Sequence, residues 1–134
     1  MKQQVETLVR QHDELRALAD DYERALASLE PDMPALAKFR WTLARLVSTH
    51  LAMERLMFGR LTVKTGPGVT RVIDEQRALA GQLDDHVRNW TVEAIADDWP
   101  AYGRTCRTMM SVMRAHLDKE ERELYPLLLQ AKAA

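Results

Sequence analysis

The stretch HLDKEERELYPLL, residues 116–128, places a histidine and several glutamates in a segment that otherwise has the pattern of an amphipathic helix. His116 and Glu120 are four residues apart, about 400° of helical rotation, so their side chains share one face. Burying an imidazole and a carboxylate on an apolar face costs free energy unless a charged partner or a metal compensates. The interpretation of this stretch therefore depends on the groups that meet it from the rest of the chain.

Outward from this stretch, apolar residues recur every three or four positions, which is the spacing of amphipathic α-helices. We expect four helices, at about residues 3–29, 34–62, 69–91 and 101–132. Three breaks separate them, namely EPDMP at 30–34, KTGPG at 64–68 and a short connection around ADDWP at 96–100. Pro126 lies inside the last segment, where a proline is expected to kink or loosen the final turns.

No alternating strand pattern interrupts these helices, so the predicted fold class is all-α. Four helices of this length with short connections predict an antiparallel up-down-up-down four-helix bundle. The length of 134 residues is that of one domain, so we expect a single bundle domain spanning residues 1–134.

The composition excludes several classes of partner. The chain has 19 basic and 20 acidic residues, well mixed, with a net charge of −1, so we expect no nucleic-acid and no membrane partner. Cys106 is the only cysteine, which excludes an internal disulfide and fits a reducing compartment. The first residues are polar and lack the apolar region of a signal peptide, so we expect a cytoplasmic protein.

The four histidines fall on or beside the apolar stripes of four different predicted helices: His12, His50, His86 and His116. A single inward histidine is most often a hydrogen-bonded core residue. The segment HLAME repeats the spacing found above, because Glu54 follows His50 by four residues. Exposed ion pairs are the simpler explanation, but both pairs lie on stripe positions, and inward pairs call for cations or a metal.

The distances of these residues from the turns test whether they lie at one level of the bundle. His12 lies 19 residues before Pro31 and His50 lies 19 residues after it. His116 lies 16 residues after Pro100, and the same distance back from the end of the third helix falls near residues 73–76. We therefore expect convergence in one layer of five residues: His12, His50, Glu54, His116 and Glu120. A ligand set of imidazoles and carboxylates suits non-haem iron, and manganese or zinc are alternative metals for it.

His86 falls outside this level. It lies ten residues beyond Gln76, about 15 Å along a helix axis. We expect it to meet Tyr22, Arg40 and Cys106 rather than the other histidines, and it is the weaker candidate for a metal ligand.

Three segments resemble the hemerythrin-like (HHE cation-binding) domain family: QHDELR at 11–16, HLAMERLMF at 50–58 and HLDKEERELYPLL at 116–128. The resemblance covers nearly the whole chain and implies an antiparallel four-helix bundle with a carboxylate-bridged di-iron centre. It implies five metal ligands, His12, His50, Glu54, His116 and Glu120, with the two glutamates as bridges. Glu121 is a weaker alternative to Glu120, because an α-helix rotates it about 140° from His116.

The third helix departs from the family pattern. Members usually carry a histidine early in this helix, whereas this chain reads DEQRALAGQL at 74–83, with Gln76 at the corresponding place. Glutamine is a poor substitute for imidazole on a divalent transition metal. Gln76 is thus a less favoured ligand, and three outcomes stay open: a weakened or mixed di-metal site, a single metal, or an empty site whose carboxylates are satisfied by arginine or water.

The leading functional hypothesis is a hemerythrin-like non-haem iron protein that binds or senses dioxygen, nitric oxide or iron. The alternative is a metal-poor or metal-free bundle that acts as a protein–protein interaction or regulatory module, which Gln76 supports. A third hypothesis is an oxidase-like or nitric-oxide-handling enzyme on the same centre. No general base or substrate pocket follows from the sequence, so a turnover enzyme is not predicted. Tyr125 and Cys106 could tune a site or pack, and packing is the expected role of both.

Overall fold

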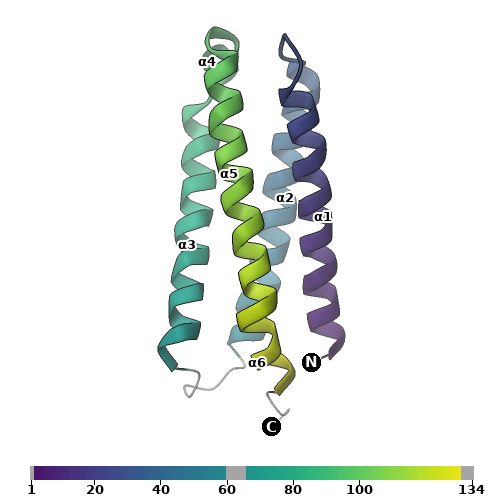
Figure 1. The fold of residues 1–134 in the computed structure, drawn as a ribbon, viewed down its shortest axis with the longest axis vertical. Helices are drawn as coiled ribbons and strands as arrows, with labels where there is room; N and C mark the ends of the chain where they lie inside the picture. The colour runs from purple at the N-terminus through teal and green to yellow at the C-terminus, as the bar shows by residue number, and fades with distance from the viewer. Residues whose placement is uncertain (1, 60–65, 131–134) are drawn as a thin grey trace.

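The computed structural model describes residues 2–59 and 66–130, and all regular structure in these ranges is helical. Four long helices lie side by side in Figure 1: α1 (Lys2–Leu26), α2 (Met33–Phe58), α3 (Gly66–Asn89) and α5 (Trp99–Lys119). The short helix α4 (Val92–Asp97) joins α3 to α5, and α5 continues into the π-helix η1 (Glu120–Leu124) and α6 (Tyr125–Gln130). The predicted all-α class is confirmed.

The breaks read from the sequence contain the signals that start the helices. Asp32 caps α2 by accepting a hydrogen bond from the Ala35 backbone N–H at 3.1 Å. Asp98 caps α5 in the same way through the Ala101 backbone N–H, also at 3.1 Å. Each cap is followed by a proline in the first turn, where the missing N–H leaves no helical hydrogen bond unmade. The prolines therefore start helices as well as ending the preceding ones.

Several boundaries differ from the expectations: α1 ends at Leu26 rather than near residue 29, and α5 begins at Trp99 rather than near residue 101. Helix α4 was not expected, and it forms because Thr91 accepts a hydrogen bond from the Ala94 N–H at 3.2 Å and so starts a new helix. Residues 66–68 are helical rather than part of the predicted loop. The predicted last helix is divided into α5, η1 and α6. The predictions for residues 60–65 and 131–132 lie outside the described residues.

The core consists of three apolar clusters stacked along the bundle. One contains Leu8, Met57 and Leu128, the next contains Leu15, Leu43 and Met113, and the last contains Tyr22, Leu36 and Tyr102. The buried histidines and glutamates of the candidate site lie in sequence between members of the first two clusters. His12, for example, lies between Leu8 and Leu15. The candidate site is therefore enclosed by apolar side chains above and below.

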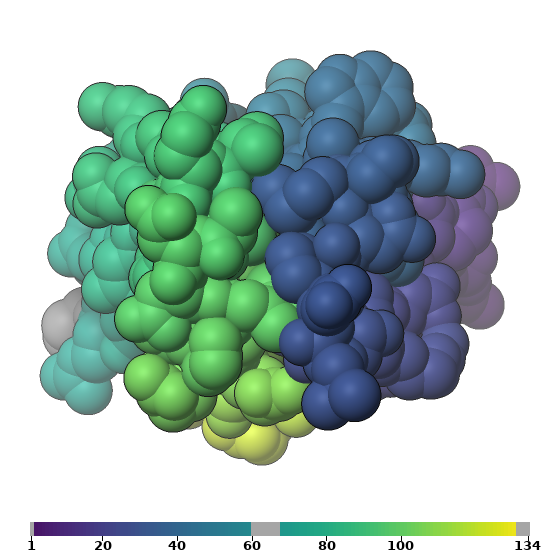
Figure 2. Space-filling view, turned by 90° about the horizontal axis from the view of Figure 1, so that it is seen from above, coloured from purple at the N-terminus to yellow at the C-terminus, as the bar shows by residue number. Residues whose placement is uncertain are grey.

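Figure 2 shows the end of the molecule near α4, where α4 and the start of α5 lie beside the connection between α1 and α2. The Trp99 Nε1–H donates a hydrogen bond to the Ser28 carbonyl at 2.8 Å, and Ile95 of α4 is completely buried. These contacts close this end of the bundle. None of the helices in the described part of the chain is both long enough and apolar enough to cross a membrane.

Candidate metal centre

The π-helix η1 sets the geometry of the site. The Tyr125 backbone N–H donates to the Glu120 carbonyl, five residues back, whereas an α-helix would pair residues four apart. Pro126 follows directly, and a proline cannot donate the backbone hydrogen bond that would continue an α-helix. The wider turn brings Tyr125 over Glu120, where an α-helix would have placed Leu124. Tyr125 and Glu120 can therefore both reach the same residue of α1.

That residue is His12, which is fully buried. Its Nε2 atom lies 3.0 Å from Nε2 of His50 and 3.2 Å from Oε1 of Glu120. The Tyr125 hydroxyl donates to the same nitrogen at 2.8 Å. Side chains from α1, α2 and the η1–α6 segment thus meet at one imidazole nitrogen.

Glu54 and His116 complete the layer. Glu54 is fully buried and contacts Nε2 of His50, yet neither carboxylate oxygen has a hydrogen-bond partner among the described residues. Nε2 of His116 lies 3.8 Å from Oε1 of Glu120 and also lacks a hydrogen bond. The Gln76 amide donates to the other Glu120 oxygen at 3.2 Å. Buried polar atoms without partners are costly, so they indicate a site for a charged ligand.

Hydrogen bonds at the far side of two imidazole rings fix which nitrogen faces the layer. Glu121 Oε2 lies 2.8 Å from Nδ1 of His12, and Gln11 Oε1 lies 2.8 Å from Nδ1 of His50. Both partner oxygens only accept, so in each neutral ring Nδ1 carries the hydrogen and Nε2 carries a lone pair. Two such lone pairs face each other at 3.0 Å, and beside the Tyr125 hydroxyl that donates to His12 a further proton or a cation would stabilise them. Metal-binding histidines are commonly held in this way.

The pKa values show the same excess of negative charge. Burial opposes protonation of His50, but the carboxylates of Glu120 and Glu54 beside its ring raise its pKa to about 9. Burial, together with the neighbouring Glu120, raises the pKa of Glu54 to about 8. Although burial works against it, the adjacent imidazoles of His12 and His50 lower the pKa of Glu120 below its usual range. The layer thus holds two carboxylates whose charge is balanced by protons unless a cation binds.

No arginine or lysine supplies that charge in the described ranges, where Glu54 and Glu120 form ion pairs only with histidines. Arg16 instead contacts Glu121 and donates to Asp118 at 2.8 Å, at the edge of the bundle. The contacts of the described residues therefore do not support an empty site in which arginine neutralises the buried carboxylates. Ligand atoms of His12, His50, Glu54 and Glu120 lie within 4.8 Å of one another, a donor set that fits a transition-metal cation.

A small cavity adjoins this donor set. It has about 30 Å³ of space for the centre of a water-sized sphere, enough for a water or a molecule of similar size. His50, Glu54, Gln76, His116 and Glu120 line its polar side. Leucine, valine and methionine side chains line the rest. The polar layer therefore has room for a small exogenous ligand beside apolar side chains.

The structure places the predicted residues as follows. The five main candidates meet in one layer, with His116 at its edge, and Gln76 lies there as the level count predicted. His86 lies in a different layer, with Nε2 3.4 Å from Cys106 Sγ and its ring stacked on Tyr102.

Sequence reasoning undervalued two groups and missed a third. Glu121 and Tyr125 both contact His12, whereas rotation along an α-helix had made Glu121 the weaker alternative to Glu120, and packing had been favoured over a role at the site for Tyr125. Gln11 was not considered at all. Pro126 was the signal for the irregular turn, and the sequence QH at 11–12 contained the missing acceptor for His50.

Comparison with known proteins is informative at the level of the family. A family model described as the hemerythrin HHE cation binding domain matches residues 3–128, which is most of the chain. No curated protein and no solved structure matches the chain.

Proposed function

Because the chain belongs to the hemerythrin HHE cation-binding domain family, we propose that its buried polar layer binds non-haem iron. The observation that carries this proposal is the pair of facing imidazole nitrogens, 3.0 Å apart, beside a buried carboxylate without hydrogen bonds. Manganese and zinc suit a similar donor set and are tested below.

The proposed ligands are His12, His50, Glu54 and Glu120 for one cation. His116, Gln76 and the second oxygens of the two glutamates would serve a second cation, which would make the centre di-iron. Gln76 is a weak donor in place of an imidazole, so we propose that the second position binds its cation less tightly. In this proposal the chain is an antiparallel up-down-up-down four-helix bundle, in which α4 is a connection and α5, η1 and α6 form one column.

The proposed activity is the binding or sensing of dioxygen, nitric oxide or iron itself in the cytoplasm. Iron would supply a redox-active centre with an open position for a diatomic ligand. The protein would hold the imidazoles in place through Glu121 and Gln11, and exclude bulk water with the apolar lining of the small cavity. The Tyr125 hydroxyl, whose pKa burial raises, contacts His12 Nε2 and stays protonated; once that nitrogen held a cation, the hydroxyl would be a free hydrogen-bond donor beside the centre.

Anaerobic reconstitution tests the proposal. The purified chain is loaded separately with ferrous iron, manganese and zinc, and bound metal per chain and melting temperature are measured. We expect between one and two irons per chain and a higher melting temperature. When oxygen or nitric oxide is admitted, we expect a new visible absorption band that is lost on removal of the gas.

A second candidate function follows from Gln76. Its amide donates a hydrogen bond to one Glu120 oxygen at 3.2 Å. A histidine at this position that bound metal would leave this oxygen free to bind metal as well. This contact favours a metal-poor bundle that acts as an interaction or regulatory module. Absence of bound metal together with an unchanged melting temperature would support this module and reject iron binding. Sustained consumption of oxygen in the presence of reductant would instead indicate an enzyme.

A further inference from the structure

A second and larger pocket lies between α2 and α3, away from the buried acidic side chains. Its volume is about 380 Å³, and it is open to solvent on one side. The walls are mainly apolar and include Leu43 and Val47 of α2 and Leu83 of α3, while Met110 of α5 forms part of the floor. A pocket of this size and character is typical of a site for a small organic molecule.

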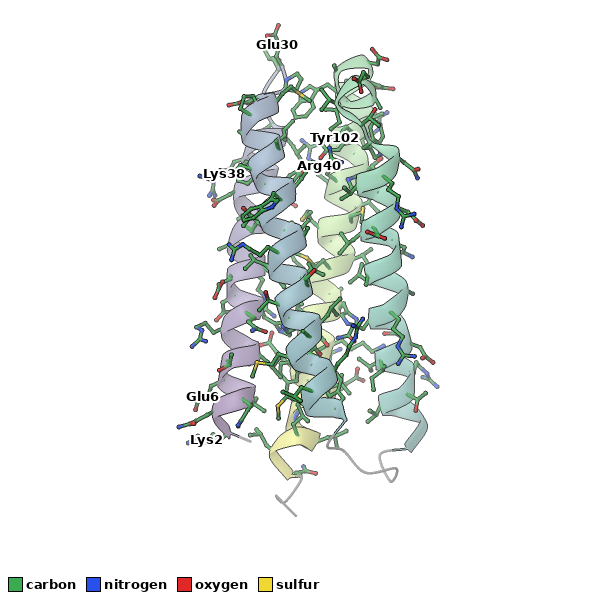
Figure 3. The ribbon with its side chains drawn as sticks, turned by 180° about the vertical axis from the view of Figure 1, so that it is seen from behind. Lys2, Glu6, Glu30, Lys38, Arg40 and Tyr102 are labelled. Carbon is green, nitrogen blue, oxygen red and sulfur yellow. The ribbon has the colours of Figure 1, made fainter. Side chains whose placement is uncertain are left out.

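Arg40 and His86 lie at one end of this pocket. Arg40 donates from Nη2 to the Val87 carbonyl at 2.7 Å, but its buried Nε has no hydrogen-bond partner among residues 2–59 and 66–130. His86 is similar, since Nε2 lies 3.4 Å from Cys106 Sγ while the buried Nδ1 has no partner within the same ranges. Figure 3 shows Arg40 on α2 near Tyr102. Two nitrogens that could each donate a hydrogen bond therefore lack an acceptor at the same end of one pocket.

The charge of this end is positive. Arg40 forms no ion pair with a carboxylate in the described ranges. Asp84 also lines the pocket, but it pairs with Arg88 at 2.5 Å. Cys106 does not supply a negative charge, because burial raises the pKa of its thiol. A partly buried guanidinium without a carboxylate favours an anionic ligand, and guanidinium groups match carboxylates particularly well.

We propose that this pocket binds a small carboxylic acid with an apolar tail. The carboxylate would accept hydrogen bonds from Arg40 Nε and His86 Nδ1, and the tail would lie along Leu43 and Val47. Four residues, Val47, Leu51, Ala80 and Leu83, line both this pocket and the small cavity beside Glu54. The tail therefore points toward the polar layer, although binding of the acid does not depend on a metal there.

Titration with octanoate tests the proposal, with 1-octanol as the neutral probe of the same chain length. Binding to the purified full chain is measured by calorimetry. We expect saturable binding of octanoate that is at least about tenfold tighter than that of octanol, because charge-assisted hydrogen bonds contribute to the carboxylate alone. Equal affinity for the two probes, or no saturable binding of octanoate, would overturn the proposal.

Two substitutions locate the ligand. Arg40→Gln should weaken octanoate binding about tenfold or more, whereas Lys38→Gln, at an exposed position on the same helix, should leave it unchanged. Figure 3 shows Lys38 on the other side of α2 from Arg40. If Arg40→Gln lowers the helix content, Arg40→Lys serves instead, because it keeps the charge but removes the planar fork. Unchanged binding in a folded Arg40 variant would refute the assigned head-group position.

A third substitution tests the tail. Gly81 lines the pocket, and a side chain begun there meets no other atom within 4 Å. Gly81→Leu should therefore keep the fold, because leucine favours the helical conformation more than glycine does. The new side chain should fill the pocket and abolish octanoate binding. Octanoate that still binds a folded Gly81→Leu variant with the original affinity would show that the acid binds elsewhere.

Discussion

The bundle contains two buried polar layers, and each includes histidine and tyrosine. In the first, His12 meets His50, Glu120 and Tyr125. In the second, His86 stacks on Tyr102 at a centroid distance of 5.6 Å and faces Cys106, while the hydroxyls of Tyr22 and Tyr102 contact each other. In the first layer neither carboxylate oxygen of Glu54 has a hydrogen-bond partner among the described residues, whereas in the second the hydroxyls, the thiol and one nitrogen of His86 contact one another and only Nδ1 of His86 is left without a partner there.

The difference shows that the partners of an inward histidine decide its role. Burial and the nearby charge of Arg40 lower the pKa of His86, so this ring is neutral and suits hydrogen bonding to a thiol. The pKa of His50 is raised to about 9, against the effect of burial, because the carboxylates of Glu120 and Glu54 beside the ring favour a positive charge there. Only the carboxylate-rich layer creates a demand for a cation.

The largest expected effect separates the two layers directly. His50→Ala should abolish metal binding, because it removes an imidazole that faces His12 and Glu54. His86→Ala, the matched change in the other layer, should leave bound metal per chain nearly unchanged. Metal at a hundred times its dissociation constant should also stabilise the wild type and His86→Ala by about 2.7 kcal/mol, but not His50→Ala. Equal loss of metal in both variants would contradict the division into two layers.

The next effect concerns the hydrogen bond that holds His12. Glu121→Gln should weaken metal binding roughly 10–100-fold, because an amide holds the imidazole less firmly than the carboxylate 2.8 Å from Nδ1. Glu123→Gln, at an exposed position in the same π-helix, is the control and should have no effect. Metal titrations of the two variants measure the difference. Equal affinities would mean that Glu121 only forms the surface ion pair with Arg16.

A smaller gain is expected at the position that departs from the family. Gln76→His replaces an amide that donates to Glu120 by an imidazole that can bind metal, so iron affinity should rise about tenfold and the second cation should bind more fully. Gln82→His introduces the same residue at an exposed position of α3 and should change nothing. Iron titrations of the two variants should therefore diverge, and no gain at Gln76 would mean that this position does not face the cation.

The sequence predicted the shared level of the main site residues because helical rise is regular and the turns are marked by proline. The same regularity explains what it missed. A π-helix changes the rotation between residues, so the positions of Glu121 and Tyr125 could not be obtained from 100° per residue. Helix α4 depends on the Thr91 cap within a short connection, and Gln11 points at His50 only through side-chain geometry.

The smallest expected effect compares the two tyrosines that contact the layers. Tyr22→Phe should lower stability by about 1 kcal/mol, roughly 4 °C in melting temperature, because it removes the hydroxyl contact with Tyr102. It should leave bound metal per chain and any visible absorption unchanged.

Tyr125→Phe removes a similar hydroxyl, but this one donates to His12 Nε2 at 2.8 Å. Its removal should therefore alter the absorption spectrum of the iron-loaded protein after gas is admitted, since a hydrogen-bond donor beside the centre is lost. Thermal unfolding and spectra of both variants are measured on iron-loaded samples of equal metal content. A spectral change from Tyr22→Phe would mean that the layers are coupled through the apolar cluster between them, which contains Leu15, Leu43 and Met113. If the two layers are independent, only Tyr125→Phe should change the spectrum. Coupling between distant sites needs a packed element that can adopt two discrete arrangements.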